Sequence, residues 1–221
     1  MKQIRKIMAM VLVFALFITA GNIATIPVQA ETTPALTSQK YSIVYQKNET
    51  DLVNTLYVYI QNVPKNGKIT KVTSKNSKVA TAGIALYAKN TVQLTAKKPG
   101  STTFEVTVKA GKKTYRLKAP LTVYSYTSPV SSVKIGSKQC ASALKKSSKT
   151  SIAYKKNGKY RLSVTPKKDW KLVYSGYFEG FSSKAVSNNG TFTVKKKNGY
   201  LLLSFYNSKK NASESIRIEF K

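Results

Sequence analysis

The sequence predicts an all-β protein that consists of two tandem antiparallel β-sandwich domains behind a cleaved signal peptide. Three observations carry this prediction. Apolar residues alternate with polar ones at a period of two in nearly every apolar segment, which is typical of half-buried strands. Turn residues separate these segments, and no helical pattern of about 10–15 residues lies between them. The 191 residues that follow the leader exceed one sandwich of roughly 100 residues and suit two.

Residues 1–30 are typical of a secretory signal peptide. Three basic residues precede an apolar run over residues 7–20, and short side chains precede a cleavage position between Ala30 and Glu31. A membrane anchor is the alternative, but the apolar run has 14 residues, fewer than the roughly 20 that cross a bilayer. We therefore expect a secreted, extracellular protein, free or associated with the cell wall, with no transmembrane anchor once the leader is removed.

The predicted strands combine β-branched and aromatic residues with polar residues between them. They lie at residues 41–45, 56–60, 104–108, 121–124, 133–135, 160–164, 170–174 and 215–221. The best candidate for a short helix is residues 139–146, where small and apolar residues are grouped.

Glycine-containing pairs mark the turns between these strands. Asn-Gly pairs favour tight hairpins because both residues tolerate positive φ. The chain has four of them, at residues 66–67, 157–158, 189–190 and 198–199. Pro99-Gly100 and Ala110-Gly111 predict two further turns.

The domain boundaries follow from composition. Residues 31–38 are expected to form a short disordered lead-in to a first domain at 39–126. A proline surrounded by small polar residues interrupts the strand pattern, because proline cannot donate to a sheet ladder. We therefore place a linker at 127–132 and a second domain at 133–221.

Two segments of the first domain carry a recognisable pattern. Residues 74–81 read Ser-Lys-Asn-Ser-Lys-Val-Ala-Thr, a polar turn that runs into a strand. Residues 94–108 read Leu-Thr-Ala-Lys-Lys-Pro-Gly-Ser-Thr-Thr-Phe-Glu-Val-Thr-Val, a Thr-Ala strand, a glycine turn and a threonine-rich strand. This pattern resembles the group 2 bacterial immunoglobulin-like domain, over about the second half of the first domain. The second domain resembles immunoglobulin-like domains only in general terms.

The resemblance implies a bacterial immunoglobulin-like β-sandwich that serves as an extracellular spacer, an adhesive unit or an appendage to enzymes. It supplies no catalytic residues. The pattern is also physically consistent, because Val79 would enter a buried strand after a polar turn and Gly100 would take the reversal. Alternate residues of the last strand would share one sheet face, namely Phe104, Val106 and Val108.

The sequence offers little catalytic chemistry. It has no histidine, which removes the commonest general base and metal ligand. The acids are scattered, and we expect Glu105 and Glu219 to face solvent between strand residues, although a converging carboxylate pair of the glycosidase type is the alternative. Cys140, the single cysteine, is expected to be a small buried hydrophobe, with an intermolecular disulfide or a reactive thiol as the alternative. We expect no enzyme, no metal ligands and no cofactor.

Charge is the dominant feature of the composition. The chain has 38 lysines and arginines against eight aspartates and glutamates, a formal net charge of +30, and such a surplus attracts polyanions. Many lysines stand in pairs or triplets beside predicted turns, so we expect them at the ends of the sandwiches. The candidate polyanion-binding residues are Lys97, Lys98, Lys112, Lys113, Lys155, Lys156, Lys167, Lys168, Lys195, Lys196, Lys197, Lys209 and Lys210. Protection of loops and edges from aggregation is the alternative role.

Aromatic residues provide a second candidate site. Trp170 lies on one side of a predicted strand and is expected in the core. Tyr177, Phe178 and Phe181 lie in a glycine-containing segment, residues 175–183, that we expect to be a surface loop. Exposed aromatic side chains can bind sugars or a host surface.

The sequence therefore predicts a secreted, non-enzymatic bacterial surface module with a binding or structural role. Its expected partners are anionic cell-wall polymers or other extracellular polyanions, held by lysine point charges. Lysine outnumbers arginine heavily, which fits a repetitive polymer better than site-specific phosphate recognition. The alternative is a carbohydrate- or host-surface adhesin that uses the aromatic loop. No specific nucleic acid is expected as a partner.

Overall fold

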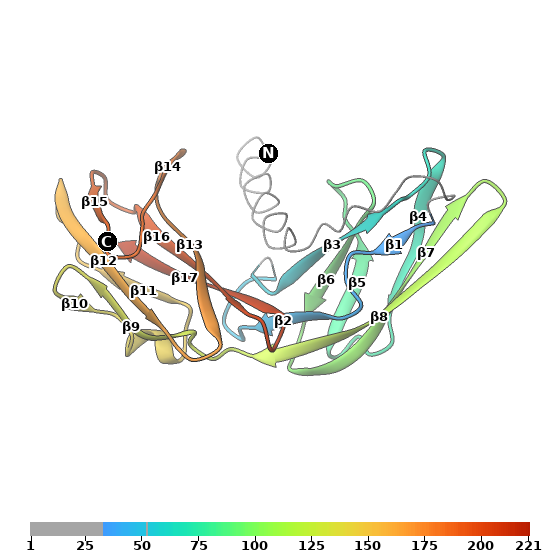
Figure 1. Cartoon of the computed structure of the whole chain (residues 1–221), viewed down its shortest axis with the longest axis horizontal. Coiled ribbons are helices and arrows are strands. Elements are labelled where there is room, and N and C mark those ends of the chain that lie inside the picture. Colours follow the sequence, from blue (N-terminus) through green and yellow to red (C-terminus); the bar gives the residue numbers. More distant parts are fainter. Residues whose placement is uncertain (1–32, 52) are drawn as a thin grey trace. The chain divides into compact units, whose positions relative to one another are not determined.

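The structure, a computed structural model, describes residues 33–51 and 53–221. The predicted signal peptide and its cleavage position lie outside the described residues. The chain divides into two compact units, the first ending at Val123 and the second comprising Tyr124–Lys221 (Figure 1). Strands dominate both units, and each unit is built from two sheets. The predicted all-β class with two sandwiches is confirmed.

The first unit contains eight strands in its described part. They are β1 (Ala35–Leu36), β2 (Tyr41–Tyr45), β3 (Thr55–Gln61), β4 (Gly67–Ser74), β5 (Ala80–Ile84), β6 (Thr91–Ala96), β7 (Gly100–Ala110) and β8 (Lys113–Ser125). One sheet has the order β1-β3-β6-β5 and the other β2-β8-β7-β4. If the strands are lettered A, A′, B, C, D, E, F and G along the chain, the sheets are ABED and A′GFC, which is the immunoglobulin arrangement.

Alternate residues of β7 fill the core of the first unit. Phe104, Val106 and Val108 are fully buried, and the residues between them are only partly covered. The ring of Tyr41 meets Phe104 edge-on, with centroids 5.4 Å apart. Val79 is also buried at its strand entry, and a Cβ on Gly100 would come within 3.0 Å of its side chain. The inward positions of β7 and the burial of Val79 confirm the sequence prediction, whereas Gly100, which was expected in the reversal, is the first residue of β7 and pairs with Val123.

The second unit has nine strands and one short helix. They are β9 (Val130–Ile135), β10 (Lys138–Gln139), the 3-10 helix η1 (Ala143–Lys145), β11 (Lys149–Ile152), β12 (Gly158–Pro166), β13 (Trp170–Glu179), β14 (Ser182–Ala185), β15 (Thr191–Val194), β16 (Tyr200–Asn207) and β17 (Ala212–Phe220). The sheets have the orders β10-β9-β12-β15 and β11-β17-β16-β13-β14. Strand β11 runs parallel to β17, whereas the other pairs are antiparallel.

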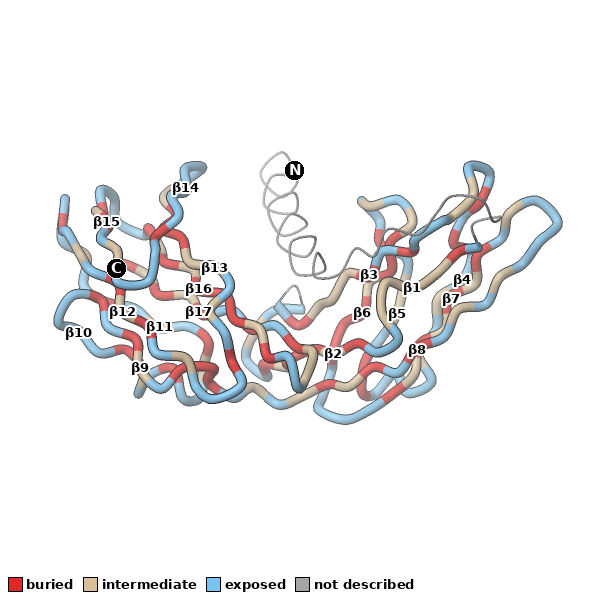
Figure 2. Tube along the Cα trace, in the orientation of Figure 1, coloured by how far each residue is buried: buried red, intermediate tan, exposed pale blue. Residues whose placement is uncertain are grey.

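Aromatic rings join the two sheets of the second unit. Tyr177 of β13 lies against Phe192 of β15 and Phe220 of β17, with centroid distances of 5.4 and 5.8 Å. Tyr160 of β12 contacts the same two phenylalanines. Trp170 is buried, as predicted. Figure 2 shows the buried positions alternating with exposed ones along the strands of each unit.

The Asn-Gly pairs do not form the predicted hairpins. Each of the four connects strands of different sheets: β3 to β4, β11 to β12, β14 to β15, and β15 to β16. A two-residue hairpin of type I′ needs positive φ at both central residues. In the last three pairs only the asparagine has positive φ, between 55° and 66°, so these pairs do not form type I′ turns. The chain instead crosses to the other sheet at each of them.

The tight hairpins of this structure have a glycine with positive φ in place of an Asn-Gly pair. Gly111, Gly136 and Gly180 have φ of 59°, 61° and 60° and stand first in two-residue loops. Glycine in that place with a following residue at negative φ is the signature of a type II′ turn. The Ala110-Gly111 turn is the one of these three that the sequence predicted.

The boundaries of elements also depart from expectation. Residues 35–36 belong to the predicted disordered lead-in, yet they form β1, where Leu36 pairs with Ile60. The predicted linker at 127–132 is shorter, because β9 begins at Val130 and pairs with β12. The segment 139–146 contains a 3-10 helix of only three residues.

We predict that Phe205→Ala lowers the free energy of unfolding of the second unit by about 3–5 kcal/mol, because Phe205 is fully buried and its removal leaves a cavity. Phe181→Ala makes the same chemical change at a side chain that is 78% exposed, so its effect should stay within about 0.5 kcal/mol. Urea unfolding followed by the fluorescence of Trp170, the single tryptophan, measures both. Equal losses in the two variants would contradict the core assignment.

Candidate functional site

The predicted lysines lie where the sequence placed them. All thirteen occupy connections between strands, except Lys113, which is the first residue of β8. Twelve are exposed and Lys210 is half-buried. Their location at turns is therefore a property of the structure, whereas their binding role stays a prediction.

Strand pairing brings two of the lysine turns together in the second unit. Lys155 and Lys156 precede β12, and residues 195–197 follow β15. Gly158 at the start of β12 pairs with Val194 at the end of β15, so the two turns are neighbours. The hydroxyl of Tyr154 donates to the carbonyl of Lys195 at 2.8 Å. The two turns lie far apart in the sequence, and the register between β12 and β15 is what brings them together.

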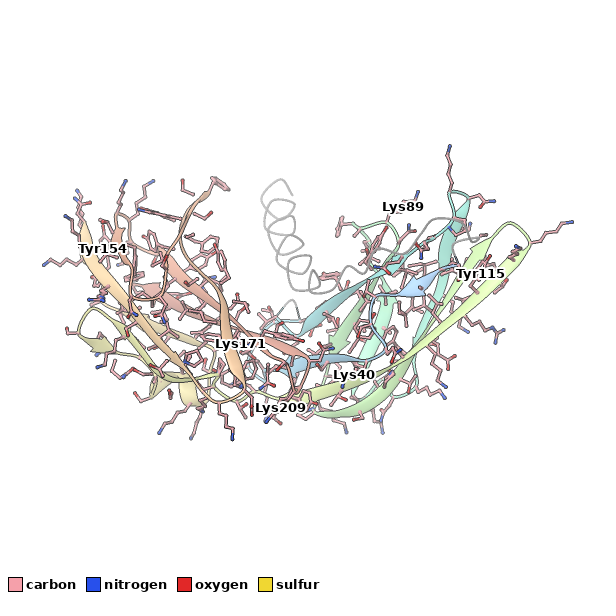
Figure 3. All side chains as sticks on the ribbon, in the orientation of Figure 1. Lys40, Lys89, Tyr115, Tyr154, Lys171 and Lys209 are labelled. Atoms are coloured by element: carbon pink, nitrogen blue, oxygen red, sulfur yellow. The ribbon has the colours of Figure 1, made fainter. Side chains whose placement is uncertain are left out.

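The C-terminal residue joins the same cluster. The backbone N–H of Tyr154 donates to the carbonyl of Lys221 at 2.7 Å. We call this cluster the basic end of the second unit, and Figure 3 shows Tyr154 there among exposed side chains. The basic end consists of Lys155, Lys156, Lys195, Lys196, Lys197 and Lys221.

A pocket of about 440 Å³ opens beside the basic end. Three lysines line it, of which Lys155 belongs to the basic end, while Lys138 and Lys159 were not singled out from the sequence. Lys138 closes the β9–β10 hairpin and Lys159 is the second residue of β12. The other lining residues are Ile135, Gly136, Ser137, Ile152, Ala153, Gly158 and Tyr160.

One acid near the basic end is already engaged by cations. Glu219 contacts Arg217 at 2.9 Å and Lys221 at 2.7 Å. The hydrogen bond from Lys221, assisted by the charge of Arg217, lowers the pKa of Glu219. Arg217 also lies 3.9 Å from the centre of the Tyr200 ring. In the described part of the chain, no ion pair involves Lys155, Lys156 or residues 195–197.

Two other lysine turns carry an acid of their own. Lys209 contacts Asp169 at 3.0 Å, beside the turn at residues 167–168. In the first unit, Lys97 contacts Asp51 at the same distance. Exposed pairs of this kind contribute little stability, but they reduce the positive field at those turns. At the basic end Lys221 is paired with Glu219, whereas Lys155, Lys156 and residues 195–197 make no ion pair among the described residues.

The structure corrects the aromatic site. Residues 175–179 belong to β13 and are not in a loop, and Tyr177 and Phe178 are buried, at 5% and 3% exposure. Tyr177 points into the core between the sheets, and its burial, with the nearby charge of Glu179, raises its pKa to about 12. Phe178 stacks on Tyr200, its cross-strand partner, with centroids 5.1 Å apart.

The prediction of a loop at residues 175–183 was wrong because it relied on two glycines. Gly176 pairs within the sheet, with Ala185 on one side and Leu202 on the other, so it does not break the strand. Gly180 makes the actual turn, and Phe181 follows it at the tip of the β13–β14 hairpin. Of the three predicted aromatic contacts, Phe181 alone is strongly exposed.

The remaining reactive groups are structural or isolated. Cys140 is buried, as predicted, and burial raises the pKa of its thiol, which makes the thiol less reactive. Glu105 faces solvent beside Lys118, at 3.9 Å, also as predicted.

Among the described residues, no group of three or more acidic, histidine or cysteine side chains could hold a metal ion. No helix in this part of the chain has the length and apolar character to cross a membrane.

Solved structures with a similar architecture share little sequence with this chain. Domains 5–6 of the S-layer protein SbsC are 19% identical over 86% of this chain and 97% of theirs, with a TM-score of 0.30. A SusE-like surface located polysaccharide binding protein from the Bacteroides thetaiotaomicron heparin utilisation locus is 12% identical over 83% and 88%, with a TM-score of 0.29. The N-terminal four Ig domains of Dscam1 isoform 4.44 are 10% identical, with a TM-score of 0.30.

This chain spans 52% of the Dscam1 structure and matches it over 85% of its own length. No protein-family model matches the chain, and no curated protein matches it. Because the TM-scores are near 0.3, the function has to be argued from the site itself.

We predict that acid weakens the second unit partly through Glu219. Folding lowers the pKa of Glu219 below its ordinary value of 4.5, so the ionised carboxylate stabilises the folded state above that pH. This stabilisation is lost as the pH falls through the folded-state pKa. Glu219→Gln should therefore lose less stability than the wild type between pH 6 and about pH 3, in urea titrations followed by Trp170 fluorescence. An identical loss in both proteins would show that Glu219 does not contribute.

Proposed function

We propose that this protein is a secreted, non-enzymatic bacterial surface module that is held electrostatically to anionic cell-wall polymers. The observation that carries the proposal is the basic end, where two turns far apart in sequence bring five lysines together without an ion pair among the described residues. The similarity of residues 74–108 to the group 2 bacterial immunoglobulin-like domain belongs to the same proposal, since that family occurs in bacterial surface and secreted proteins.

Repulsion between the lysines is the physical reason for a polymeric partner. Grouped positive charges repel one another, and a polyanion removes this repulsion while it releases its own counterions. Lysine ammonium groups act as mobile point charges and do not require a fixed ligand geometry. A flexible polymer with a repeated charge suits them better than a small ligand with one defined shape.

The alternative, an adhesin that uses aromatic side chains, has lost most of its support. Tyr177 packs between the two sheets and Phe178 stacks on Tyr200 of the neighbouring strand β16, and both side chains are buried, so they are unavailable to a ligand. Of the three predicted aromatic contacts, Phe181 is the one exposed enough to contact a sugar or a host surface. A single exposed phenylalanine at a hairpin tip provides little binding area.

We predict that binding to isolated cell walls weakens as salt rises and that the triple variant Lys195→Gln, Lys196→Gln, Lys197→Gln reduces the slope of log affinity against log salt by roughly 2–3. The matched control is Lys134→Gln, Lys171→Gln, Lys184→Gln, which removes the same charge from exposed lysines of the same unit that are not candidate polyanion-binding residues. It should change the slope less. Sedimentation with walls over a salt series measures both.

Retention that does not change between low and high salt would contradict the electrostatic proposal. Phe181→Ala separates the two functions, because it leaves the charge unchanged. If Phe181→Ala abolished binding while the lysine variants kept it, the aromatic alternative would be correct.

A further inference from the structure

The outer face of one sheet in the first unit carries a second group of cations. Along β7, Phe104, Val106 and Val108 point into the core, so the residues between them point outward. In β8 the same alternation holds, and in β4 the register with β7 places Lys68 and Lys71 on this face on either side of a bulge. The exposed cations on this face are Lys68, Lys71, Lys75, Lys109, Arg116 and Lys118. We call it the lysine face.

Strand register arranges these cations in rows across the sheet. Lys68 of β4 stands directly opposite Lys109 of β7. In the next row, Thr107 lies between Lys71 and Arg116. Strands in a sheet are about 4.8 Å apart and alternate residues about 6.7 Å apart. The lysine face therefore carries cations in successive rows of one sheet surface, with one register shift between Ile69 and Lys71.

One acid is available on these strands to neutralise the cations of the lysine face. Glu105 is the acid on these three strands, and it contacts Lys118 at 3.9 Å. Like charges directly opposite each other destabilise an antiparallel pair, so Lys68 and Lys109 oppose folding unless an anion lies between them. Lysines that serve solubility alone are usually interspersed with acids.

Threonines occupy the positions between the cations. Thr73, Thr107 and Thr114 stand in the same cross-strand rows as the lysines. Ammonium groups and hydroxyls are both among the side-chain donors that proteins place on phosphate oxygens. The chemistry of the face therefore favours a phosphodiester chain over an isolated anion.

We propose that the lysine face binds a linear polyphosphodiester, a poly(polyol phosphate) chain that lies flat on β4, β7 and β8. This proposal rests on the proposed function and adds a second surface, of defined chemistry, in the other unit. From Lys68 to Lys75 the face is on the order of 20 Å long. A chain with several phosphates can contact several cations at once, whereas a monomer cannot.

The test compares two fourfold variants of the full chain in titrations with purified poly(glycerol phosphate). The face variant carries Lys68→Gln, Lys71→Gln, Lys109→Gln and Arg116→Gln. The matched control carries Lys40→Gln, Lys47→Gln, Lys78→Gln and Lys89→Gln, which are exposed lysines of the same unit that lie outside the three strands and outside the candidate polyanion-binding residues. We expect the face variant to lose at least about tenfold in affinity at low salt and the control to lose about threefold or less.

Two competitors define the ligand. Monomeric glycerol phosphate should not displace the polymer, and polyglutamate of equal charge should bind more weakly than the polyphosphodiester. Equal binding of polyglutamate would overturn the phosphodiester assignment. Equal losses in the two fourfold variants would overturn the lysine face while the proposed function stood. Failure of the wild type to bind any wall polymer would overturn both.

A single substitution keeps the proposal testable if the fourfold face variant fails to fold. Lys109→Thr removes the like-charge opposition and introduces a residue that strands favour. We expect it to raise the melting temperature of the free protein and to reduce the increase in melting temperature on addition of poly(glycerol phosphate). A lower melting temperature together with an unchanged polymer effect would contradict the proposal.

Discussion

The constraint on which the rest of the structure depends is a positive charge that the protein cannot neutralise from within. Thirty-eight basic residues face eight acids, so most cations need a place in water and away from one another. A two-layer sandwich provides two such places, the turns at the ends and the outward positions of each strand. Every sheet face and turn of this protein that lies outside the apolar core is therefore a potential cationic surface.

The two units use these places differently. In the second unit, the pairing of β12 with β15 brings two lysine turns together at the basic end. In the first unit, the register of β4, β7 and β8 arranges cations in rows on a sheet face. The apolar core supports both arrangements, because buried side chains such as Phe104 and Phe205 fix the register of the strands that carry the lysines. Stability and the proposed attachment thus depend on the same strand alternation.

Periodicity predicted the parts of the structure that depend on local sequence. The inward positions of β7, the burial of Trp170 and the lysines at turns follow from alternation and turn chemistry, and the burial of Cys140 follows from the apolar character of a free cysteine. The errors arose where tertiary contacts decide. The Asn-Gly pairs cross between sheets, and Tyr177 and Phe178 are held in a strand by Phe192 and Tyr200. The opposition of Lys68 and Lys109 needs the register, which no short-range pattern contains.

Electrostatic attachment of these lysines to an anionic polymer can be observed by nuclear magnetic resonance of isotope-labelled protein titrated with poly(glycerol phosphate), because each backbone amide reports separately. We expect shift changes at the turns of residues 155–156 and 195–197 and along β4, β7 and β8, and we expect added salt to reverse them. Shift changes confined to Phe181 and the β13–β14 hairpin, or changes that persist at high salt, would contradict electrostatic attachment.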